Sequence, residues 1–286
     1  MGDGKMRARE TLRLMLRNRN FVFGMILIAI PLSMALFPQY IAPYDPWERV
    51  DKSFLRPNSK HLLGTNDIGQ DLLSEIIYGA RISMLVGFAA ASFTVVLGVL
   101  MGTFAGYFGG ILDELLTGVT DVMLLLPSLP LMIVMASMLG QGYINIILVL
   151  SILTWPGVAR MIRSQVLSIR ERAYIEVSKA IGCSDTRILF VHILPQIVPL
   201  SLANIVIRIG AAMVSEASLS FLGLGDPTQK SWGVILYWVQ KTGGFSLGAW
   251  WWILPPGIMI TISVLGFTQL GFAMERIVNP RLKERE

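Results

Sequence analysis

Six apolar blocks, each of about twenty residues or more, constrain the fold of this chain more than any other feature of its sequence. A helix needs about 20 apolar residues to cross the hydrocarbon core of a bilayer, so each block predicts one transmembrane helix. Charged residues make up only 15% of the 286 residues, whereas a soluble domain would carry about a quarter. The sequence therefore predicts an all-α membrane protein. The expected spans cover approximately residues 21–41, 82–107, 111–140, 143–161, 197–224 and 250–274.

The basic residues predict how these spans are oriented. Six spans place both termini on one side, where residues 1–20, 160–187 and 275–286 hold most of the Lys and Arg. The opposite side holds fewer than half as many, so the positive-inside rule places both termini in the cytoplasm. The predicted order is a cytoplasmic N-terminal segment (1–20), a first, uncleaved span (21–41), an extracytoplasmic loop with an elbow helix (42–81), a five-helix core (82–274) and a cytoplasmic tail (275–286).

A polar stretch from residue 170 to residue 195 interrupts the apolar core and is expected to face the cytoplasm. Its sequence predicts a helix, a left-handed turn at Gly182 that ends the helix, and a second short helix. Ser184 and Asp185 are N-cap candidates for the second helix. Pro195 is expected to end it, because the residue before a proline disfavours the α conformation. From these residues alone, the stretch is either a docking element or an amphipathic helix at the membrane interface.

The spacing of Glu176, Gly182 and the Leu194-Pro195 pair resembles the EAA loop of bacterial and archaeal ABC importer permeases. Two alanines and an isoleucine of that motif are replaced here. In that family the loop is cytoplasmic and docks its helix into a groove on the ATPase subunit. The resemblance implies that the residues that couple this chain to an ATPase are Glu176, Ala180, Gly182, Asp185, Leu194 and Pro195.

A second stretch, residues 61–71 in the predicted extracytoplasmic loop, resembles the GTDxxGRD segment of the dipeptide, oligopeptide and nickel branch of this family. Asn66 and Gln70 replace the Asp and Arg of that segment, so an ion pair at these two positions is not implied here. Asp67 and Gln70 have the spacing of a capping box, which predicts the start of the elbow helix. The elbow residues are Gly64, Thr65, Asp67 and Asp71, and a capped surface helix without a function accounts for them equally well.

The fifth span contains two charged residues, Arg208 and Glu216, that are eight positions apart. This spacing predicts that both lie toward one side of the helix. Charged residues inside a membrane are costly, and by default they mark functional positions. The two residues are therefore expected either to form a polar pair within the helix bundle or to line a translocation path.

The sequence offers no catalytic chemistry of its own. It contains no GxxxxGK[ST] phosphate loop, no GxSxG nucleophile and no HExxH motif, and it has only two histidines and one cysteine. We therefore predict no catalytic residue, no metal site and no cofactor bound by this chain. Nucleic acid is not an expected partner, because no basic patch is interleaved with aromatic residues.

The resemblance implies the type I fold of ABC importer permeases and a place in a prokaryotic cell membrane. The chain would form half of a translocation pathway beside a second, related permease, with two ATPase subunits that hold Mg-ATP and an extracytoplasmic substrate-binding protein. Peptides are the leading substrate, because the spans offer no soft or nitrogen ligands for nickel, and oligosaccharides are the second candidate. The alternatives from other functional classes are a stand-alone channel and an intramembrane enzyme.

Overall fold

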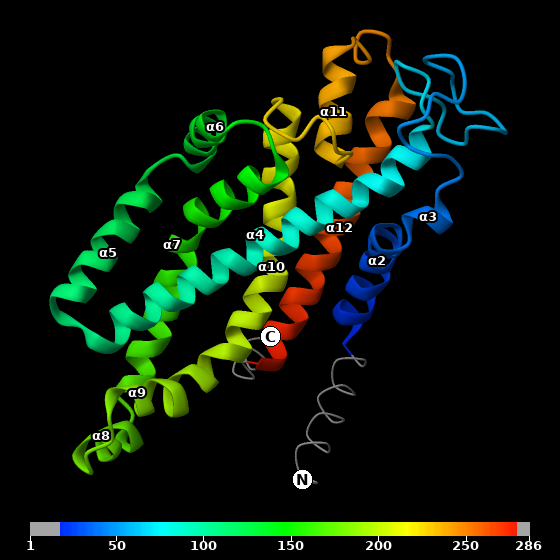
Figure 1. Cartoon of the computed structure of the whole chain (residues 1–286). Helices are drawn as coiled ribbons and strands as arrows, with labels where there is room; N and C mark the ends of the chain where they lie inside the picture. Colours follow the sequence, from blue (N-terminus) through cyan, green and yellow to red (C-terminus); the bar gives the residue numbers. More distant parts are fainter. Residues whose placement is uncertain (1–17, 279–286) are drawn as a thin grey trace.

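The computed structural model describes residues 18–278, and over that range the chain forms helices joined by turns and loops (Figure 1). The predicted segments before residue 18 and after residue 278 lie outside the described residues. The helices are α2 (Arg19–Leu36), α3 (Pro38–Ile41), α4 (Leu72–Phe108), α5 (Gly110–Leu125), α6 (Ser128–Leu139), α7 (Tyr143–Arg170), α8 (Ala173–Ala180), α9 (Asp185–Arg187), the π-helix η1 (Ile188–Ile193), α10 (Leu194–Phe221), α11 (Trp232–Lys241) and α12 (Trp250–Val278).

Within residues 18–278, five helical segments are long and apolar enough to cross a membrane: α2, α4, α7, α12 and the continuous run from α9 to α10. α5 and α6 form a sixth candidate as a pair, bent by 95° where they meet. The predicted all-α fold with six spans is therefore confirmed, with the third span broken. Pro127 explains the break, because Leu126 before it is extended (ψ 138°), as a residue that precedes proline tends to be.

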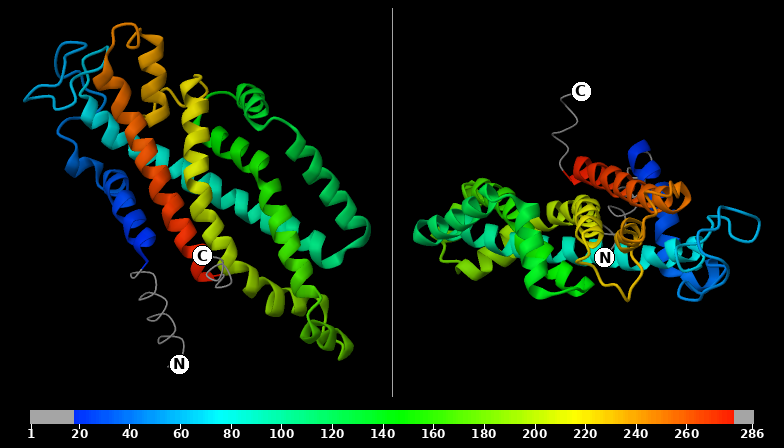
Figure 2. Two further views of the ribbon diagram at one scale, coloured as in Figure 1. Left: turned by 180° about the vertical axis from the view of Figure 1, so that it is seen from behind. Right: turned by 90° about the horizontal axis from the view of Figure 1, so that it is seen from above.

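α4 is the helix around which the others are arranged. It runs diagonally between the two ends of the molecule, and α7 and α10 pack along it (Figures 1 and 2). Gly98, Gly102 and Gly106 face α7 at four-residue spacing, and a Cβ on Gly102 would lie 2.4 Å from the carbonyl oxygen of Ala159. Small residues at this spacing allow two helices to approach closely in a membrane.

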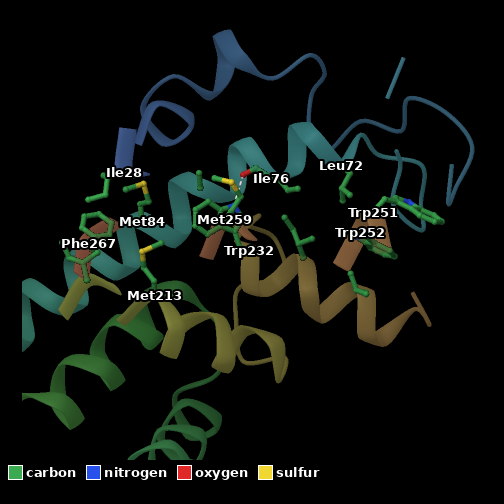
Figure 3. Close-up of a cluster of buried hydrophobic side chains, with 14 of the residues drawn as sticks. Ile28, Leu72, Ile76, Met84, Met213, Trp232, Trp251, Trp252, Met259 and Phe267 are labelled. Carbon is green, nitrogen blue, oxygen red and sulfur yellow. Dashed lines mark hydrogen bonds between the residues drawn. The ribbon is translucent and has the colours of Figure 1, made fainter. Parts of the chain in front are cut away.

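A buried apolar cluster joins α2, α4, α10, α11 and α12 (Figure 3). Trp232 is fully buried there, and its indole N–H donates a hydrogen bond to the carbonyl of Ile76 at 3.0 Å. Trp251 and Trp252 also pack into the cluster, while Trp250 is exposed. The cluster fixes the end of the molecule that carries residues 42–71.

The predicted start of the second span is corrected by the structure. α4 begins at Leu72, ten residues earlier than expected, and its N-cap is Asp71, whose carboxylate accepts a hydrogen bond from the backbone N–H of Ser74 at 2.9 Å. The capping box expected at Asp67 is wrong, because Asp67 lies in a turn before the helix. Asp71 is the better cap because a histidine also holds its side chain in place, as described below.

The separate elbow helix expected within residues 42–81 is also wrong. Residues 42–71 form turns and one isolated bridge, and residues 72–81 are the first turns of α4. Leu72 and Ile76 are buried, so this part of α4 packs like the rest of the helix. The structure therefore has one long helix where the sequence predicted two.

The helix ends gather at two opposite ends of the molecule. The start of α2, the end of α12 and α8 lie toward one end of the molecule, while α11 and residues 42–71 lie toward the other (Figures 1 and 2).

Candidate functional site

The α8 segment, residues 171–193, projects from one end of the bundle between α7 and α10 (Figure 1). Its first helix ends in a Schellman motif. The N–H of Gly182 donates to the carbonyl of Lys179, and the N–H of Cys183 donates to that of Ser178, both at 3.0 Å. Gly182 has a φ of +86°, so the predicted left-handed turn is confirmed. A Cβ at this position would meet no atom within 4 Å, so glycine is required here for its backbone conformation alone.

A single buried side chain anchors α8. Ile175 is fully buried in an apolar cluster that includes residues of α4, α7, η1 and α10. Glu176 and Ala180, two of the predicted coupling residues, are exposed. Val177 and Ile181 are 59% and 74% exposed, although both are large apolar residues. α8 therefore presents a mixed charged and apolar surface that no part of residues 18–278 covers.

The other side of the α8 segment is tied to α4 through Tyr107. The Tyr107 hydroxyl donates a hydrogen bond to Asp185 Oδ1 at 2.5 Å, and Lys179 Nζ lies 5.3 Å from the centre of the tyrosine ring. Arg170 Nη1 donates to the carbonyl of Tyr107 at 2.9 Å. Sequence reasoning missed this contact, because a lone tyrosine at the end of an apolar span gives no signal. Asp185, predicted as a coupling residue, is exposed but is already engaged by Tyr107.

The helix that was expected to end at Pro195 continues, which corrects that prediction. Ser184 caps α9, and residues 188–193 then form a π-helix, in which the N–H of Leu194 donates to the carbonyl of Leu189, five residues earlier. The wider π turn accommodates a proline, which has no N–H and whose ring clashes with the carbonyl four residues earlier in an α-helix. Leu194 is half-buried and Pro195 is exposed at the start of α10. The α8 segment thus runs into α10 without a break.

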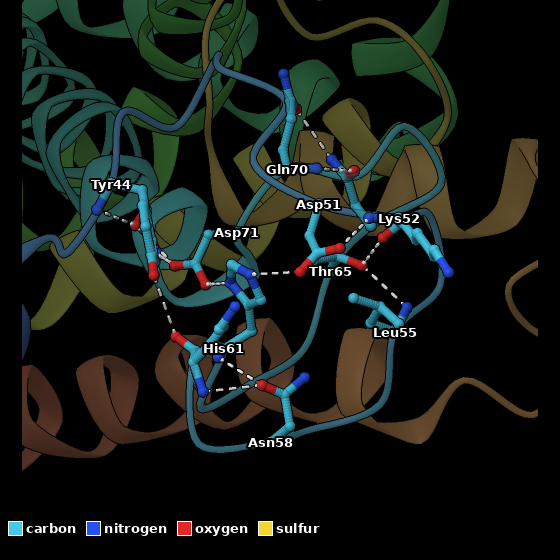
Figure 4. Close-up of polar contacts among 12 residues, drawn as sticks. Tyr44, Asp51, Lys52, Leu55, Asn58, His61, Thr65, Gln70 and Asp71 are labelled. Carbon is cyan, nitrogen blue, oxygen red and sulfur yellow. Dashed lines mark hydrogen bonds and ion pairs between the residues drawn. The ribbon is translucent and has the colours of Figure 1, made fainter.

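At the opposite end of the molecule, His61 organises the loop before α4 (Figure 4). Its Nδ1 lies 2.8 Å from Asp71 Oδ1, and its Nε2 lies 3.6 Å from Asp51 Oδ2. The second carboxylate oxygen of Asp71 accepts the hydroxyl proton of Ser74 at 2.7 Å. His61 and Asp71 are both buried. These contacts hold the N-cap of α4 against a residue ten positions earlier in the chain.

Gly64 and Thr65 shape the same loop. Gly64 has a φ of +75°, and a Cβ there would lie only 2.3 Å from the carbonyl oxygen of Leu55. The Thr65 hydroxyl donates to the carbonyl of Lys52 at 2.7 Å and accepts the N–H of Leu55 at 2.9 Å. Together with Asp71, these two predicted elbow residues are explained by local structure.

Asn66 and Gln70 form a buried polar cluster with Glu75 and Lys230. Asn66 Nδ2 donates to Gln70 Oε1 at 2.9 Å and to Glu75 Oε1 at 3.1 Å. Lys230 Nζ donates to Gln70 Oε1 at 2.8 Å and forms a salt bridge with Glu75. The cluster joins the loop before α4 to the loop before α11.

Asp67 is the predicted elbow residue that takes no part in the hydrogen bonds described above. It lines a pocket of about 260 Å³ beside the polar cluster, together with Trp47, Trp238 and Trp252. Burial raises the pKa of Asp67 above the ordinary value of 3.8, against smaller opposing contributions from backbone hydrogen bonds and Lys230.

Arg208 and Glu216 do not pair with each other. Glu216 is buried, and its Oε1 accepts hydrogen bonds from the hydroxyls of Ser220 and Ser231 at 2.8 Å each. Arg208 points toward α7, where its Nη1 lies 3.5 Å from the carbonyl oxygen of Thr154. Eight residues turn an α-helix by about 80° beyond two full turns, which is enough to aim the two side chains at different neighbours.

Comparison with known proteins adds to this geometry. The family model "Binding-protein-dependent transport system inner membrane component" matches residues 94–284, and the model "N-terminal TM domain of oligopeptide transport permease C" matches residues 7–58. The dipeptide transport system permease protein DppC of Haemophilus influenzae is 34% identical over 276 residues, which cover 94% of this chain and 92% of that protein. The oligopeptide transport system permease protein OppC of Bacillus subtilis is 32% identical over 292 residues, which cover 99% and 95%.

Two further similarities were found. The glutathione transport system permease protein GsiD of Pectobacterium atrosepticum is 32% identical over 278 residues, which cover 96% of this chain and 91% of that protein. An inward-facing structure of the MetNI methionine ABC transporter has a similar fold, with a TM-score of 0.56 and 21% identity over 73% of this chain and 95% of the matched chain.

Proposed function

Because this chain belongs to the family of binding-protein-dependent transport system inner membrane components, we propose that it is the permease subunit of an ABC importer for dipeptides or oligopeptides. The family consists of transport permeases and not of enzymes. The relatives named for dipeptide and oligopeptide transport support a peptide substrate, because this chain aligns with them over nearly its whole length. Oligosaccharides and nickel remain the alternative substrates to be tested.

The observation that carries this proposal is the α8 segment. Its outer surface is exposed, a left-handed turn shapes it, and it is continuous with α10. In our proposal it docks into a groove of a separate ATPase subunit, with Glu176 presenting a charge and Val177 and Ile181 presenting apolar contacts. Mg-ATP is then bound and hydrolysed in the ATPase subunits, and the segment carries their movement into α10 as a rigid body.

The orientation of the chain in the membrane and its remaining partners follow from the same proposal. The end that carries α8 faces the cytoplasm, as the excess of Lys and Arg on that side predicts. The opposite end, with residues 42–71 and α11, faces an extracytoplasmic binding protein. A second, related permease forms the other half of the pathway in a prokaryotic cell membrane.

Substitution of Gly182 tests the role of the α8 segment. Gly182→Val should reduce uptake at least tenfold while leaving membrane insertion intact, because a β-branched residue strains a backbone with a φ of +86°. Gly140→Val is the matched control: Gly140 has a φ of +85° and equally open surroundings, but it lies at the other end of α7. Equal uptake by the two variants would contradict docking through the α8 segment.

A pull-down from detergent-solubilised membranes tests the assembly and the substrate. The tagged chain should co-purify with a second permease and with vanadate-sensitive ATPase activity. The reconstituted complex with its binding protein should take up labelled dipeptides in preference to oligosaccharides or nickel. Recovery of the chain alone, with no ATPase, would favour a stand-alone channel and reduce the α8 segment to an interfacial helix.

A further inference from the structure

The side of α10 that carries Arg208, beside α7, is unusually polar for a membrane helix. Asn204, Arg208, Ala211, Ser215 and Ser218 recur at spacings of three and four residues, so they share one side of the helix. All five are half-buried or exposed in the isolated chain. A lipid-facing surface would be apolar, so the part of this side that α7 leaves exposed faces either water or a partner subunit.

Arg208 differs from the other polar residues of this surface because its donors are not satisfied. The hydroxyls of Ser215 and Ser218 donate to carbonyls one turn earlier in α10. Arg208 has five N–H groups, but its one hydrogen bond within residues 18–278 is the 3.5 Å contact with Thr154, and its Nε is buried without a partner. The guanidinium therefore retains the capacity to bind a further acceptor.

Two other arginines of the spans show how such a charge is normally balanced. Arg163 binds Asp113 through two hydrogen bonds of 2.5 and 2.6 Å, and Arg160 binds Asp121 at 2.5 Å. Among the ion pairs of residues 18–278, none contains Arg208. An unbalanced cation at membrane depth is costly, so the presence of Arg208 points to a binding partner outside residues 18–278.

The space beside Arg208 is suited to a small anionic group. A pocket of about 50 Å³ lies between α4, α7 and α10, lined by Thr94, Thr154 and Ser215 besides Arg208 and small or apolar residues. Since one water occupies about 30 Å³ of the liquid, the pocket has room for a group the size of a carboxylate. Arg208 is its one titratable residue. Gly157 leaves space for the guanidinium, because a Cβ there would lie 3.2 Å from Nη2.

The hydroxyls of this pocket leave the arginine as its main donor. Thr154 Oγ1 donates to the carbonyl of Leu150 at 2.7 Å, so in its 2.8 Å contact with Thr94 it is the acceptor. Ser215 donates to its own helix. The planar guanidinium of Arg208 is therefore the main donor available to an incoming acceptor. It can donate two parallel hydrogen bonds to a carboxylate.

We infer that Arg208 is a binding residue of the translocation pathway and takes the C-terminal carboxylate of a transported peptide. This inference rests on the proposed function and adds a substrate contact that lies far from the α8 segment. Asn204, Ala211, Ser215 and Ser218 then form part of the water-lined wall along which the peptide passes.

The test compares uptake by proteoliposomes that contain the complete transporter and its binding protein. The probes are two labelled peptides that the wild type takes up and that differ only in a free or an amidated C-terminal carboxyl group. Arg208→Gln should lower uptake of the free acid at least tenfold and uptake of the amide less than twofold. The binding protein's own preference cancels, because each peptide is compared between permease variants.

Three results would overturn the inference. Uptake of both peptides could fall by the same factor, uptake of neither peptide could fall, or the variant complex could fail to assemble with its partner permease. The last result would assign Arg208 to the subunit interface. If Arg208→Gln does not fold, Arg208→Lys is the second variant, because it keeps the charge but lacks the planar guanidinium. Uptake of the free acid should again fall more than uptake of the amide. Equal changes in the uptake of the two peptides would refute the inference. Wild-type vesicles that take up no peptide at all would instead contradict the proposed function.

Discussion

Replacement of Tyr107 by phenylalanine isolates the contact that holds the α8 segment against α4. The substitution removes only the hydroxyl, so the hydrogen bond to Asp185 is lost. The ring is almost fully buried and remains under Lys179, and Arg170 still binds the backbone carbonyl of residue 107. Any change in the segment can therefore be assigned to one hydrogen bond.

The expected cost follows from the environment of that bond. A hydrogen bond to a charged group contributes about 1.5–3 kcal/mol. Asp185 is exposed, so water replaces part of the lost interaction, and the expected cost falls to the bottom of that range or just below it, about 1–1.5 kcal/mol. A change of that size shifts a local opening equilibrium about five- to tenfold. Backbone amides of residues 173–187 should therefore exchange with deuterium about five to ten times faster in Tyr107→Phe.

Hydrogen exchange of the assembled complex, read by mass spectrometry, measures this opening directly. Tyr143→Phe is the matched control, because Tyr143 begins α7, the helix that leads into the segment, and its hydroxyl makes no hydrogen bond within residues 18–278. Unchanged exchange in Tyr107→Phe, or equal acceleration in both variants, would refute the assignment of the tether to Tyr107. If the tether carries movement between the ATPases and α4, Tyr107→Phe should also raise the amount of ATP hydrolysed per peptide taken up.

Two further predictions concern the opposite end of the molecule. Lys230→Met should lower the stability of the complex by about 3–5 kcal/mol in denaturant unfolding, because it leaves the carboxylate of Glu75 buried without its cation. The double variant Glu75→Gln, Lys230→Met should recover most of that loss, and a double variant no more stable than Lys230→Met alone would contradict this reasoning. Asp67→Asn should raise the melting temperature at pH 7. Because the folded pKa of Asp67 is raised, the wild type loses stability as pH rises above 3.8, so the advantage of the variant should shrink as pH falls toward that value; a gain that does not depend on pH would be inconsistent with burial as its cause.

The features that the sequence predicted correctly depend on local chemistry. The number of spans follows from the lengths of the apolar blocks. The turn at Gly182 follows from the one residue type that adopts a left-handed backbone without cost. Each of these signals lies within a few residues of the structure that it determines.

The features that the sequence mispredicted or did not reveal depend on contacts between residues that are separated in the chain. Asp67 and Asp71 are both acidic residues before an apolar run, and the choice of Asp71 as the cap of α4 depends on His61. The contact between Gln70 and Lys230, which the sequence did not reveal, joins residues 160 positions apart. No local pattern contains this information, because these side chains meet only when the loop before α4 folds on itself and packs against the loop before α11.

The continuation of the helix through Pro195 is the error with the greatest consequence for mechanism. A proline at this place predicts a hinge, and a hinge would let the α8 segment move while α10 stayed still. The π turn at residues 188–193, whose buried side chains pack in the same cluster as Ile175, replaces the hinge with a continuous helical path. Arg208 lies fourteen residues beyond Leu194, about 21 Å along the helix axis at 1.5 Å per residue. Because the path is continuous, a rotation of the α8 segment must either bend α10 or displace Arg208, so the two ends of the proposed mechanism are joined by one helix.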